Sequence, residues 1–296
     1  MKRQHALLGA LVADAAAMGL HWLYDQEQIK LVEATGSLLF RQPEAAVYAG
    51  KKGYFAHATR RSGQLSHYGE SARIAGVVAS NYTTSEHQTA FMASFGPCGS
   101  YHGYADRPTK QLIARMLLDG DELAEPSGMD DDQMPGLCAV PGLFSAAASD
   151  ELTLDAVRVI STNSDVIQAA QALHTVLTQL ILGVELKTAL SSAAESVDGE
   201  VGELMREALT MNKYEPLAAA QKFGLACYVK HAMPLNWYLL NHADNFESVV
   251  LDNIRCGGDN CGRSMAIGSI AGVAFGVSEK LLLQTTGIEQ FKKPLL

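Results

Sequence analysis

The chain has 296 residues, of which 48% are apolar and 19% are charged, and its formal net charge is −9. So many apolar residues exclude an intrinsically disordered chain, and the acidic excess argues against general nucleic-acid binding, which needs a basic surface. No apolar run reaches 18 residues and no Lys/Arg-rich run occurs, so we expect neither a transmembrane helix nor attachment to an anionic membrane.

The N-terminal segment is predicted to be a buried helix. Its apolar run 6–13 follows Lys2 and Arg3 and so mimics a secretory signal, but Asp14 interrupts the run after eight residues. Gly9, Ala13 and Ala17 recur every four residues, a spacing that suits one closely packed helical face.

The next segments contain short helices and loops. Residues 47–55 form the only stretch that would tolerate a strand, and its glycines make a loop the better expectation. Ser85 and Gln88 have the spacing of a capping box before a helix at 90–95, and further helical segments are expected within 91–116 and 140–148. The Pro- and Asp-rich stretch 126–135 is the strongest break, and we interpret it as a functional loop rather than a domain boundary.

The C-terminal half is predicted to be helical at 165–182, 189–196, 202–211, 216–222 and 260–277. Ser164 is the expected N-cap of the first of these helices, and Gly183 follows its end. The helix at 260–277 carries glycines at every fourth position, Gly268, Gly272 and Gly276. Interior glycines are costly in a helix, so this stripe predicts close approach of a neighbouring backbone and a central, buried position. We therefore expect one all-α domain over residues 1–296.

Clusters of polar residues mark the edges of these helices. Four clusters contain several acidic, imidazole or amide side chains: residues 14–25, which include Asp14 and His21; residues 63–70, which include Ser66, His67, Tyr68 and Glu70; residues 130–133, which include Asp131, Asp132 and Gln133; and residues 257–263. A fifth and weaker cluster is 95–106, which includes Tyr101. Asp130 to Asp132 could hold a hard cation through oxygens or could simply be solvated. His67 and Glu70 supply acid–base groups within one turn, or are structural.

The cluster 257–263 has the clearest chemical logic. Gly257 and Gly258 permit a tight turn, and Asp259 and Asn260 then fall at a helix N-terminus, where exposed N–H groups favour anions. The same field, with Arg263 nearby, is expected to lower the pKa of Cys261 and make it a reactive thiolate. The alternative is that Asp259 only caps the helix and Cys261 packs as a small apolar side chain.

The five cysteines, Cys98, Cys138, Cys227, Cys256 and Cys261, form no CxxC pair. Neither a zinc ribbon nor a disulfide framework is expected from this pattern, and a reducing compartment, the cytoplasm, is the predicted location.

Taken together, the clusters resemble the ADP-ribosylglycohydrolase superfamily over about residues 5–276. GGDNCGRSMAIGSIAGVAFG is similar to the family's GGDTDT-type segment and the small-residue helix after it, and GALVADAAAMGLHWLYD is similar to its opening segment. GQLSHYGES stands where the family has GQ-x-TDDT, MDDDQMPGLCAVPGL stands near its NG-x-x-MR-x-x-P stretch, and Thr162-Asn163 stands where Thr-His is common. LHWLYD and GGDNCGR resemble the branch that contains the J1-crystallins of jellyfish lens and related selenoproteins.

The resemblance implies a single-domain orthogonal helical bundle and a site for ADP-ribose held by a pair of Mg²⁺ ions. Most of the family's metal-binding carboxylates are replaced here, since Ser66, His67, Tyr68 and Gly69 occupy one motif, and Cys261 and Gly262 follow Asp259 in the other. Only Ser66 and Asp259 remain as metal ligands, so we doubt that Mg²⁺ is used. The implied ligand-binding residues are Asp14, His21, Ser66, Tyr68, Tyr101, Asp131, Asp132, Gln133, Asn163, Asn260 and Arg263.

Three functions remain open from the sequence. The first is a hydrolase that binds or cleaves an ADP-ribose-like or nucleotide-sugar ligand, with Asp259, His67, Glu70 and one acid of 130–132 as acid–base groups. The second is a thiol-dependent enzyme that uses Cys261 with His67 or His21, or a zinc variant with Cys261, His67 and Asp259. The third is a non-catalytic structural or binding protein of the J1-crystallin type. Neither nucleic acid nor membrane is an expected partner, and the sequence does not predict an oligomeric state.

Overall fold

The computed structural model describes residues 2–292, which fold as helices joined by loops. Within this range the only β-type pairings are three isolated bridges, among them Leu23 with Gly53 and Gln133 with Tyr228. The first half contains α1 (Gln4–Ala17), η1 (Met18–Leu20), α2 (Gln26–Glu33), α3 (Ala45–Tyr48), α4 (His67–Val78), η2 (Ala79–Asn81), α5 (Thr84–Phe95), α6 (Arg107–Asp119), η3 (Gly120–Glu122), η4 (Met134–Cys138) and α7 (Ala139–Ser145). The second half contains α8 (Asp150–Arg158), α9 (Ser164–Ile181), α10 (Leu186–Glu195), α11 (Gly199–Thr210), α12 (Pro216–Phe223), α13 (Val229–Asn241), α14 (Phe246–Cys256), α15 (Asn260–Phe275), α16 (Glu279–Gln284) and α17 (Glu289–Lys292).

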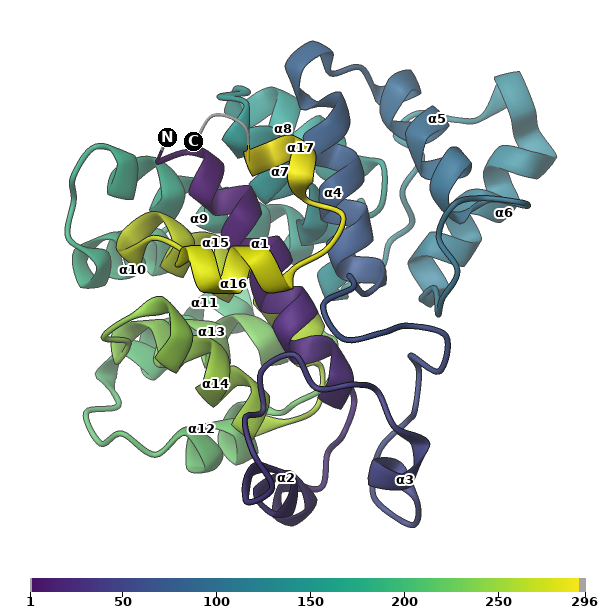
Figure 1. Ribbon diagram of the computed structural model, residues 1–296. Coiled ribbons are helices and arrows are strands. Elements are labelled where there is room, and N and C mark those ends of the chain that lie inside the picture. The colour runs from purple at the N-terminus through teal and green to yellow at the C-terminus, as the bar shows by residue number, and fades with distance from the viewer. Residues whose placement is uncertain (1, 293–296) are drawn as a thin grey trace.

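Helices α1 and α15, from opposite ends of the chain, pack against each other at the centre of the molecule (Figure 1). A Cβ on Gly268 would lie 2.7 Å from the Cβ of Ala13 and 2.8 Å from the Cα of Ala10, and a Cβ on Gly9 would lie 3.0 Å from the Cα of Gly272. Only glycine permits this backbone approach. The predicted small-residue faces of the two helices are therefore confirmed, and they pair with each other.

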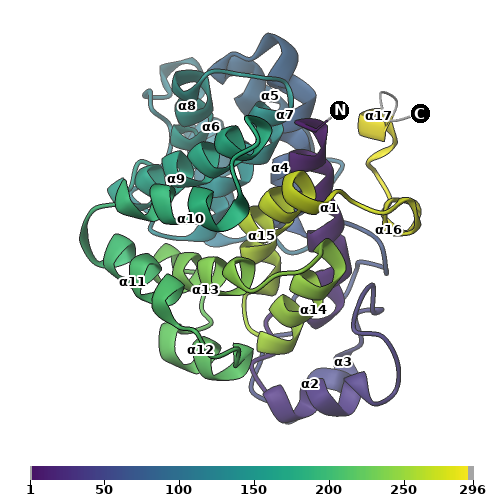
Figure 2. The same cartoon turned by 90° about the vertical axis from the view of Figure 1, so that its left-hand side faces the viewer.

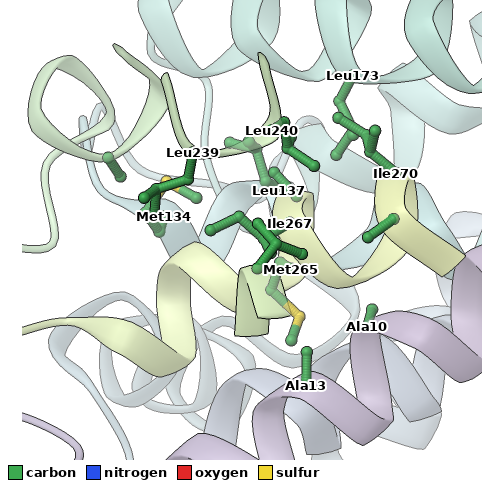
Figure 3. Packing of buried hydrophobic residues seen from close by; sticks show 14 of the residues in the cluster. Ala10, Ala13, Met134, Leu137, Leu173, Leu239, Leu240, Met265, Ile267 and Ile270 are labelled. Carbon is green, nitrogen blue, oxygen red and sulfur yellow. The ribbon is translucent and has the colours of Figure 1, made fainter. Parts of the chain in front are cut away.

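The main apolar core surrounds this helix pair. Met265, Ile267 and Ile270 of α15 are fully buried, and Figure 3 shows them beside Ala10 and Ala13 of α1 and the leucines of neighbouring helices. Complete burial of one such large apolar side chain contributes about 1.5–3 kcal/mol. Every residue of α15 from 260 to 273 is buried, as the absence of an acidic residue over this helix predicts.

The other helices surround the pair in two groups. Helices α4, α5, α6, α7 and α8 lie on one side, and α11, α12, α13 and α14 lie on the other, with α9 and α10 bridging them (Figures 1 and 2). The loop 126–135 joins the same body, because the Gly128 N–H donates to Arg158 and the Met134 N–H donates to Cys227. This confirms a loop within one domain.

The predicted helices are confirmed, with corrections at their ends. The side chain of Thr83, and not that of Ser85, caps α5, and Thr83 forms the capping-box pair with Glu86. Asn163, one residue before the predicted cap, caps α9, whereas Gly183 follows that helix with φ +88° as expected. Residues 47–55 contain the end of the short helix α3 and a loop, with one isolated bridge at Gly53. No helix within residues 2–292 has the length and apolar character to span a bilayer.

Candidate functional site

Three of the predicted polar clusters meet where α1 ends and where α4 and α15 begin. The backbone N–H of Ser66 donates to Asp14 Oδ2 at 2.7 Å, and the Ser66 hydroxyl donates to Asp14 Oδ1 at 2.5 Å. The Asn260 amide donates to the Leu20 carbonyl at 3.3 Å. Segments separated by up to 240 residues in the chain therefore form one buried group, called here the polar centre, around Asp14, His21, His67, Tyr68 and Asp259.

Asp259 is the hub of the polar centre. It caps α15, since its Oδ1 atom accepts from the Gly262 N–H, and the positive φ of Gly257 and Gly258 forms the turn before it, as predicted. His21 Nε2 lies 2.9 Å from Oδ1, and the Tyr68 hydroxyl donates to Oδ2 at 3.2 Å. Both carboxyl oxygens of this fully buried side chain are thus occupied by protein donors.

The hydrogen bond to Asp259 orients a pair of histidines. When His21 Nε2 donates to Asp259, Nδ1 of the neutral ring is an acceptor, so His57 Nε2 donates to it across 2.7 Å. Burial lowers the pKa of His21 to about 4, although Asp259 opposes the shift, and burial lowers the pKa of His57 well below its usual value. Both rings are therefore neutral at pH 7. The chain of hydrogen bonds from Asp259 through His21 to His57 ends at His57 Nδ1, which is buried without a partner among the described residues.

A second acid–histidine pair lies next to this row. His67 Nε2 is 3.2 Å from Asp106 Oδ2, and the His67 ring packs 4.2 Å from the Tyr68 ring and 5.8 Å from the His21 ring. Burial by itself would raise the pKa of Asp106, but the interaction with His67 and the hydrogen bond from Thr109 lower it. Asp106 is thus a carboxylate beside His67, and the 3.2 Å contact is an ion-pair distance without hydrogen-bond geometry. Among the described residues, both ring nitrogens of His67 are buried without a hydrogen-bond partner.

The predicted thiolate at Cys261 is wrong. Cys261 is fully buried, and its Sγ atom lies 3.7 Å from the Asp14 carbonyl oxygen. Burial, followed by the charges of Asp14 and Asp259, raises the pKa of the thiol well above its usual value. Desolvation here outweighs the helix N-terminus, because α1 covers that end of α15.

Arg263 and Asn260 serve the fold rather than a ligand. The guanidinium group of Arg263 is fully buried and donates to Asn253 Oδ1 at 2.7 Å and to the Gly257 carbonyl at 2.5 Å. The Asn260 side-chain amide donates to the Leu20 backbone carbonyl, and the Asn260 backbone carbonyl accepts from the Asn253 side-chain amide. Their predicted place among the ligand-binding residues is corrected, since the Arg263 side chain points into the packed turn before α15 and the buried Asn260 side chain holds the end of η1.

Glu70 is also removed from the acid–base candidates. Arg73 donates to both of its carboxylate oxygens, at 2.8 and 2.7 Å, and the Ser94 hydroxyl donates to Oε1. Burial alone would raise the pKa of Glu70, but these hydrogen bonds lower it. A carboxylate so fully engaged is a structural ion pair and a poor proton donor.

The loop 130–133 borders the polar centre through Arg107, the residue after Asp106. Arg107 Nη2 lies 2.5 Å from Asp131 Oδ2, and the amide of Gln133 accepts from the Cys227 thiol at 2.9 Å. Asp132 is partly exposed and its carbonyl accepts from the N–H of Val229. This loop is therefore tied to the polar centre on one side and to the start of α13 on the other.

Two predicted ligand residues have structural partners. The Asn163 side-chain NH₂ donates to Asp130 Oδ1 at 2.7 Å, while the side-chain oxygen Oδ1 of Asn163 caps α9 by accepting from the Asp165 N–H. Tyr101 packs 5.0 Å from Phe95, with Arg60 over its ring at 4.7 Å, on the side of α5. Both contacts are separate from the hydrogen-bond network of Asp259.

Three aromatic side chains, Trp22, Tyr54 and Tyr104, form the outer cover of the polar centre and are called here the aromatic rim. The Trp22 ring lies 5.0 Å from Tyr104 and 5.9 Å from Tyr54, and it packs 4.3 Å from His21 beneath it. Trp22 has φ +60°, a costly backbone conformation for a bulky residue. Hydrogen bonds from its N–H to Gly258 and from Tyr54 to its carbonyl hold it there.

The described residues contain no group of three or more His, Cys, Asp or Glu side chains arranged to hold a metal ion. The zinc set of Cys261, His67 and Asp259 is therefore not assembled.

Several residues of the site are not marked by any pattern in the sequence. His57 lies in a loop without periodicity, and nothing near it in the sequence marks it. Asp106 lay within the Gly- and Tyr-rich cluster 95–106, where its position before Arg107-Pro108 indicates the helix cap that it forms, but not its partner His67. Cys227 was noted only as one of five cysteines.

Comparisons with known proteins agree on the type of fold. The model of the family described as ADP-ribosylglycohydrolase matches residues 2–287. A solved structure titled "ADP-ribosylglycohydrolase-related protein complex" superposes with a TM-score of 0.69 over 99% of this chain and 96% of its own, at 15% identity. No curated protein matches the chain. Because the family model covers nearly the whole length, the chain belongs to the ADP-ribosylglycohydrolase family.

Proposed function

We propose that this chain binds an ADP-ribose-like or nucleotide-sugar ligand at the aromatic rim and acts on its glycosidic bond without magnesium. One observation carries the proposal: both oxygens of Asp259 are taken by His21 and Tyr68. Family membership supports the hydrolase class and the type of ligand. The side chains at the former metal positions support a different chemistry.

The residues present do not fit a pair of magnesium ions. Mg²⁺ requires near-octahedral oxygen coordination at about 2.0–2.1 Å. The two oxygen groups that remain, Ser66 and Asp259, are committed to Asp14 and to His21 and Tyr68 respectively. Imidazole and phenol side chains fill the space that metal-bound oxygens would need, so no step of the proposed reaction uses the metal.

His67 is the proposed acid–base group. The Asp106 carboxylate lies 3.2 Å from Nε2 of its ring, and Nδ1, which has no hydrogen-bond partner among the described residues, is the nitrogen that we assign to a ligand oxygen. The proposed step transfers a proton from the His67 imidazolium to the oxygen that leaves the anomeric carbon as the glycosidic bond breaks. Water adds its oxygen to that carbon and releases a proton, which returns to His67. The His67 ring lies 6.0 Å from Trp22 and 5.3 Å from Tyr104, so the ligand reaches it through a displacement of the aromatic rim.

The test compares binding and turnover with and without metal. Calorimetry with ADP-ribose in EDTA and in excess Mg²⁺ should give the same affinity, and hydrolysis of ADP-ribosylated substrates should persist in EDTA. His67→Gln should lower kcat by about 10²–10⁴-fold, the typical contribution of general acid–base catalysis. Activity that appears only with Mg²⁺, or an unchanged kcat in His67→Gln, would contradict the proposal.

A second candidate function is a non-catalytic role of the J1-crystallin type. The complete burial of His21 and Asp259 favours it, because a closed polar centre suits a stable protein as well as an enzyme. This alternative predicts no turnover with any nucleotide-sugar, with or without metal. Loss of all ADP-ribose binding in both conditions would favour it over the hydrolase.

The cytoplasm is the proposed compartment. All five cysteines are free thiols, and four of them are buried or partly buried. Free thiols persist in a reducing environment. Localisation of a tagged full-length chain by fluorescence microscopy tests the proposal, and an exclusively extracytoplasmic signal would contradict it.

A further inference from the structure

A cavity of about 540 Å³ lies on the other side of the turn that carries Asp259. Its walls are formed by Tyr24, Gln26 and Lys52, by the end of α12 with the turn 224–226, and by His231 at the start of α13. Its polar lining consists of Tyr24, Gln26, Lys52, Gln221 and His231, and none of the described lining residues is acidic. Lys52 is the one ammonium group among these lining side chains, and together with the histidine and the two carboxamides it favours an anionic group.

The wall formed by Gly224 and His231 is built for close contact. Gly224 follows α12 with φ +93°, and a Cβ at this position would lie 2.9–3.0 Å from the Cγ, Cδ2 and Nδ1 atoms of the His231 ring. Any larger residue would displace the ring. Neither ring nitrogen of His231 has a hydrogen-bond partner among the described residues, and Nδ1 is buried.

Lys52 is held at the mouth of the cavity by its backbone. Its carbonyl accepts from the Tyr24 N–H at 2.8 Å, which joins the 48–54 loop to the 21–24 segment. Its amine is free of any described ion pair, unlike those of Lys222 and Lys230, which lie near Glu207 and Glu200.

The cavity shares a wall with the polar centre. A Cβ on Gly258 would lie 2.5 Å from the Leu225 carbonyl oxygen and 3.0 Å from Tyr24 Cε1, and the Asp259 N–H donates to the same carbonyl at 2.9 Å. Tyr24 and Leu225 therefore separate the cavity from Asp259 by the thickness of one turn.

We infer that this cavity binds the phosphate or diphosphate group of the ligand through Lys52, His231 and the side-chain amides of Gln26 and Gln221. The volume lies in the range of about 300–1,000 Å³ that ligand pockets occupy. Ammonium, imidazole and carboxamide groups donate hydrogen bonds to phosphate oxygens without competition from a carboxylate. This inference rests on the proposed function for the rest of the ligand, the sugar and its glycosidic bond.

The experiment compares two adjacent lysines in the full chain. Lys51 and Lys52 are both exposed, but only Lys52 lines the cavity. Calorimetry with pyrophosphate and with ADP should show binding to the unmodified protein, roughly tenfold weaker binding to Lys52→Ala, and unchanged binding to Lys51→Ala. His231→Gln, which keeps a donor of similar reach, should weaken binding less than His231→Ala. Melting temperatures confirm that each variant is folded.

Three outcomes would overturn the inference. They are no binding of pyrophosphate or ADP, equal losses in both lysine variants, which would indicate surface charge alone, and binding that Lys52→Ala leaves unchanged. Pyrophosphate binding that depends on Lys52 together with absence of ADP-ribose turnover would keep the phosphate site and contradict the hydrolase. Turnover with an unchanged KM in Lys52→Ala would keep the hydrolase and contradict the phosphate site.

Discussion

The central helices α1 and α15 are packed in two different ways along their length. In the middle, Gly9 and Gly268 bring the two backbones together with no polar side chain between them. At one end, Asp14 and Asp259 are surrounded by hydroxyl, imidazole and phenol groups that hydrogen-bond to them. The close-packed middle fixes where the polar end lies, so the position of the polar centre depends on residues that take no part in its chemistry.

The largest effect is expected from breaking the close-packed middle. In Gly268→Val, the new side chain must displace Ala10 and Ala13 of α1, and overpacking of this kind costs about 3 kcal/mol or more. Ala274→Ser, a partly buried position on the same helix, is the control and should change stability little. Urea unfolding measures both variants. A Gly268→Val protein as stable as the control would mean that the two backbones do not approach as described.

The second effect is a change in the free energy of unfolding with pH, to which His21 in the polar centre and the remote His87 both contribute. Burial lowers the pKa of His87 and of His21 to about 4, so each stays neutral in the folded state while its unfolded form protonates near 6.5. Unfolding then takes up protons, and stability falls as pH drops from about 6.5 to 4. Each group contributes a loss on the order of 3 kcal/mol over this window.

Asp14 has the opposite effect on stability over the same pH range, because its contribution grows as the pH falls. Burial raises its pKa to about 6, against a lowering by the Ser66 hydrogen bonds, so the folded state holds a proton that the unfolded state has released. Its contribution is present below about pH 4 and is lost as pH rises through 6. Urea unfolding at pH 7, 5.5 and 4.5 should show a smaller acid loss in His87→Leu and a larger one in Asp14→Asn than in the unmodified chain. Parallel curves for all three proteins would contradict these assignments.

The third effect breaks the polar end at its hub. In Asp259→Asn, an amide NH₂ replaces one of the two carboxylate oxygens and therefore faces either His21 Nε2 or the Tyr68 hydroxyl, and an unsatisfied buried donor costs about 1–3 kcal/mol. Asp25→Asn is the matched control, because Asp25 also caps a helix, α2, but is partly exposed, and asparagine caps equally well. We expect a loss of about 2 kcal/mol for the first variant and almost none for the second. Equal losses of stability in the two variants would mean that Asp259 contributes only as a helix cap.

The same contrast explains what could be predicted from the sequence. Helical periodicity locates α9 and α15 because the core imposes it residue by residue, and the glycine stripe predicts a close neighbour. The caps of α5 and α9 were missed by one or two residues, because several serine, threonine and asparagine side chains near each start compete for the same N–H groups.

The polar centre was predictable only in part. Asp14, His21, His67 and Asp259 lie in polar clusters at the ends of helices, so their meeting was expected, but His57 lies in a loop that no local pattern marks. The environment of Cys261 depends on α1, which lies about 247 positions away in the chain, and no local sequence window contains that burial. Desolvation is a tertiary property, so the sign of the Cys261 pKa shift was wrong.

The smallest effect is expected at the exposed border of the polar end. The Arg107 side chain is 65% exposed, although its partner Asp131 is buried, and exposed ion pairs contribute about 0–1 kcal/mol. Arg107→Gln should therefore lower stability by less than about 1 kcal/mol in urea unfolding, with a smaller loss at high salt because ions screen the pair. A loss as large as that of Asp259→Asn would mean that Asp131 depends on Arg107 as a buried partner does. The loop 130–133 would then be part of the polar centre, which would extend to Asp131 and Arg107.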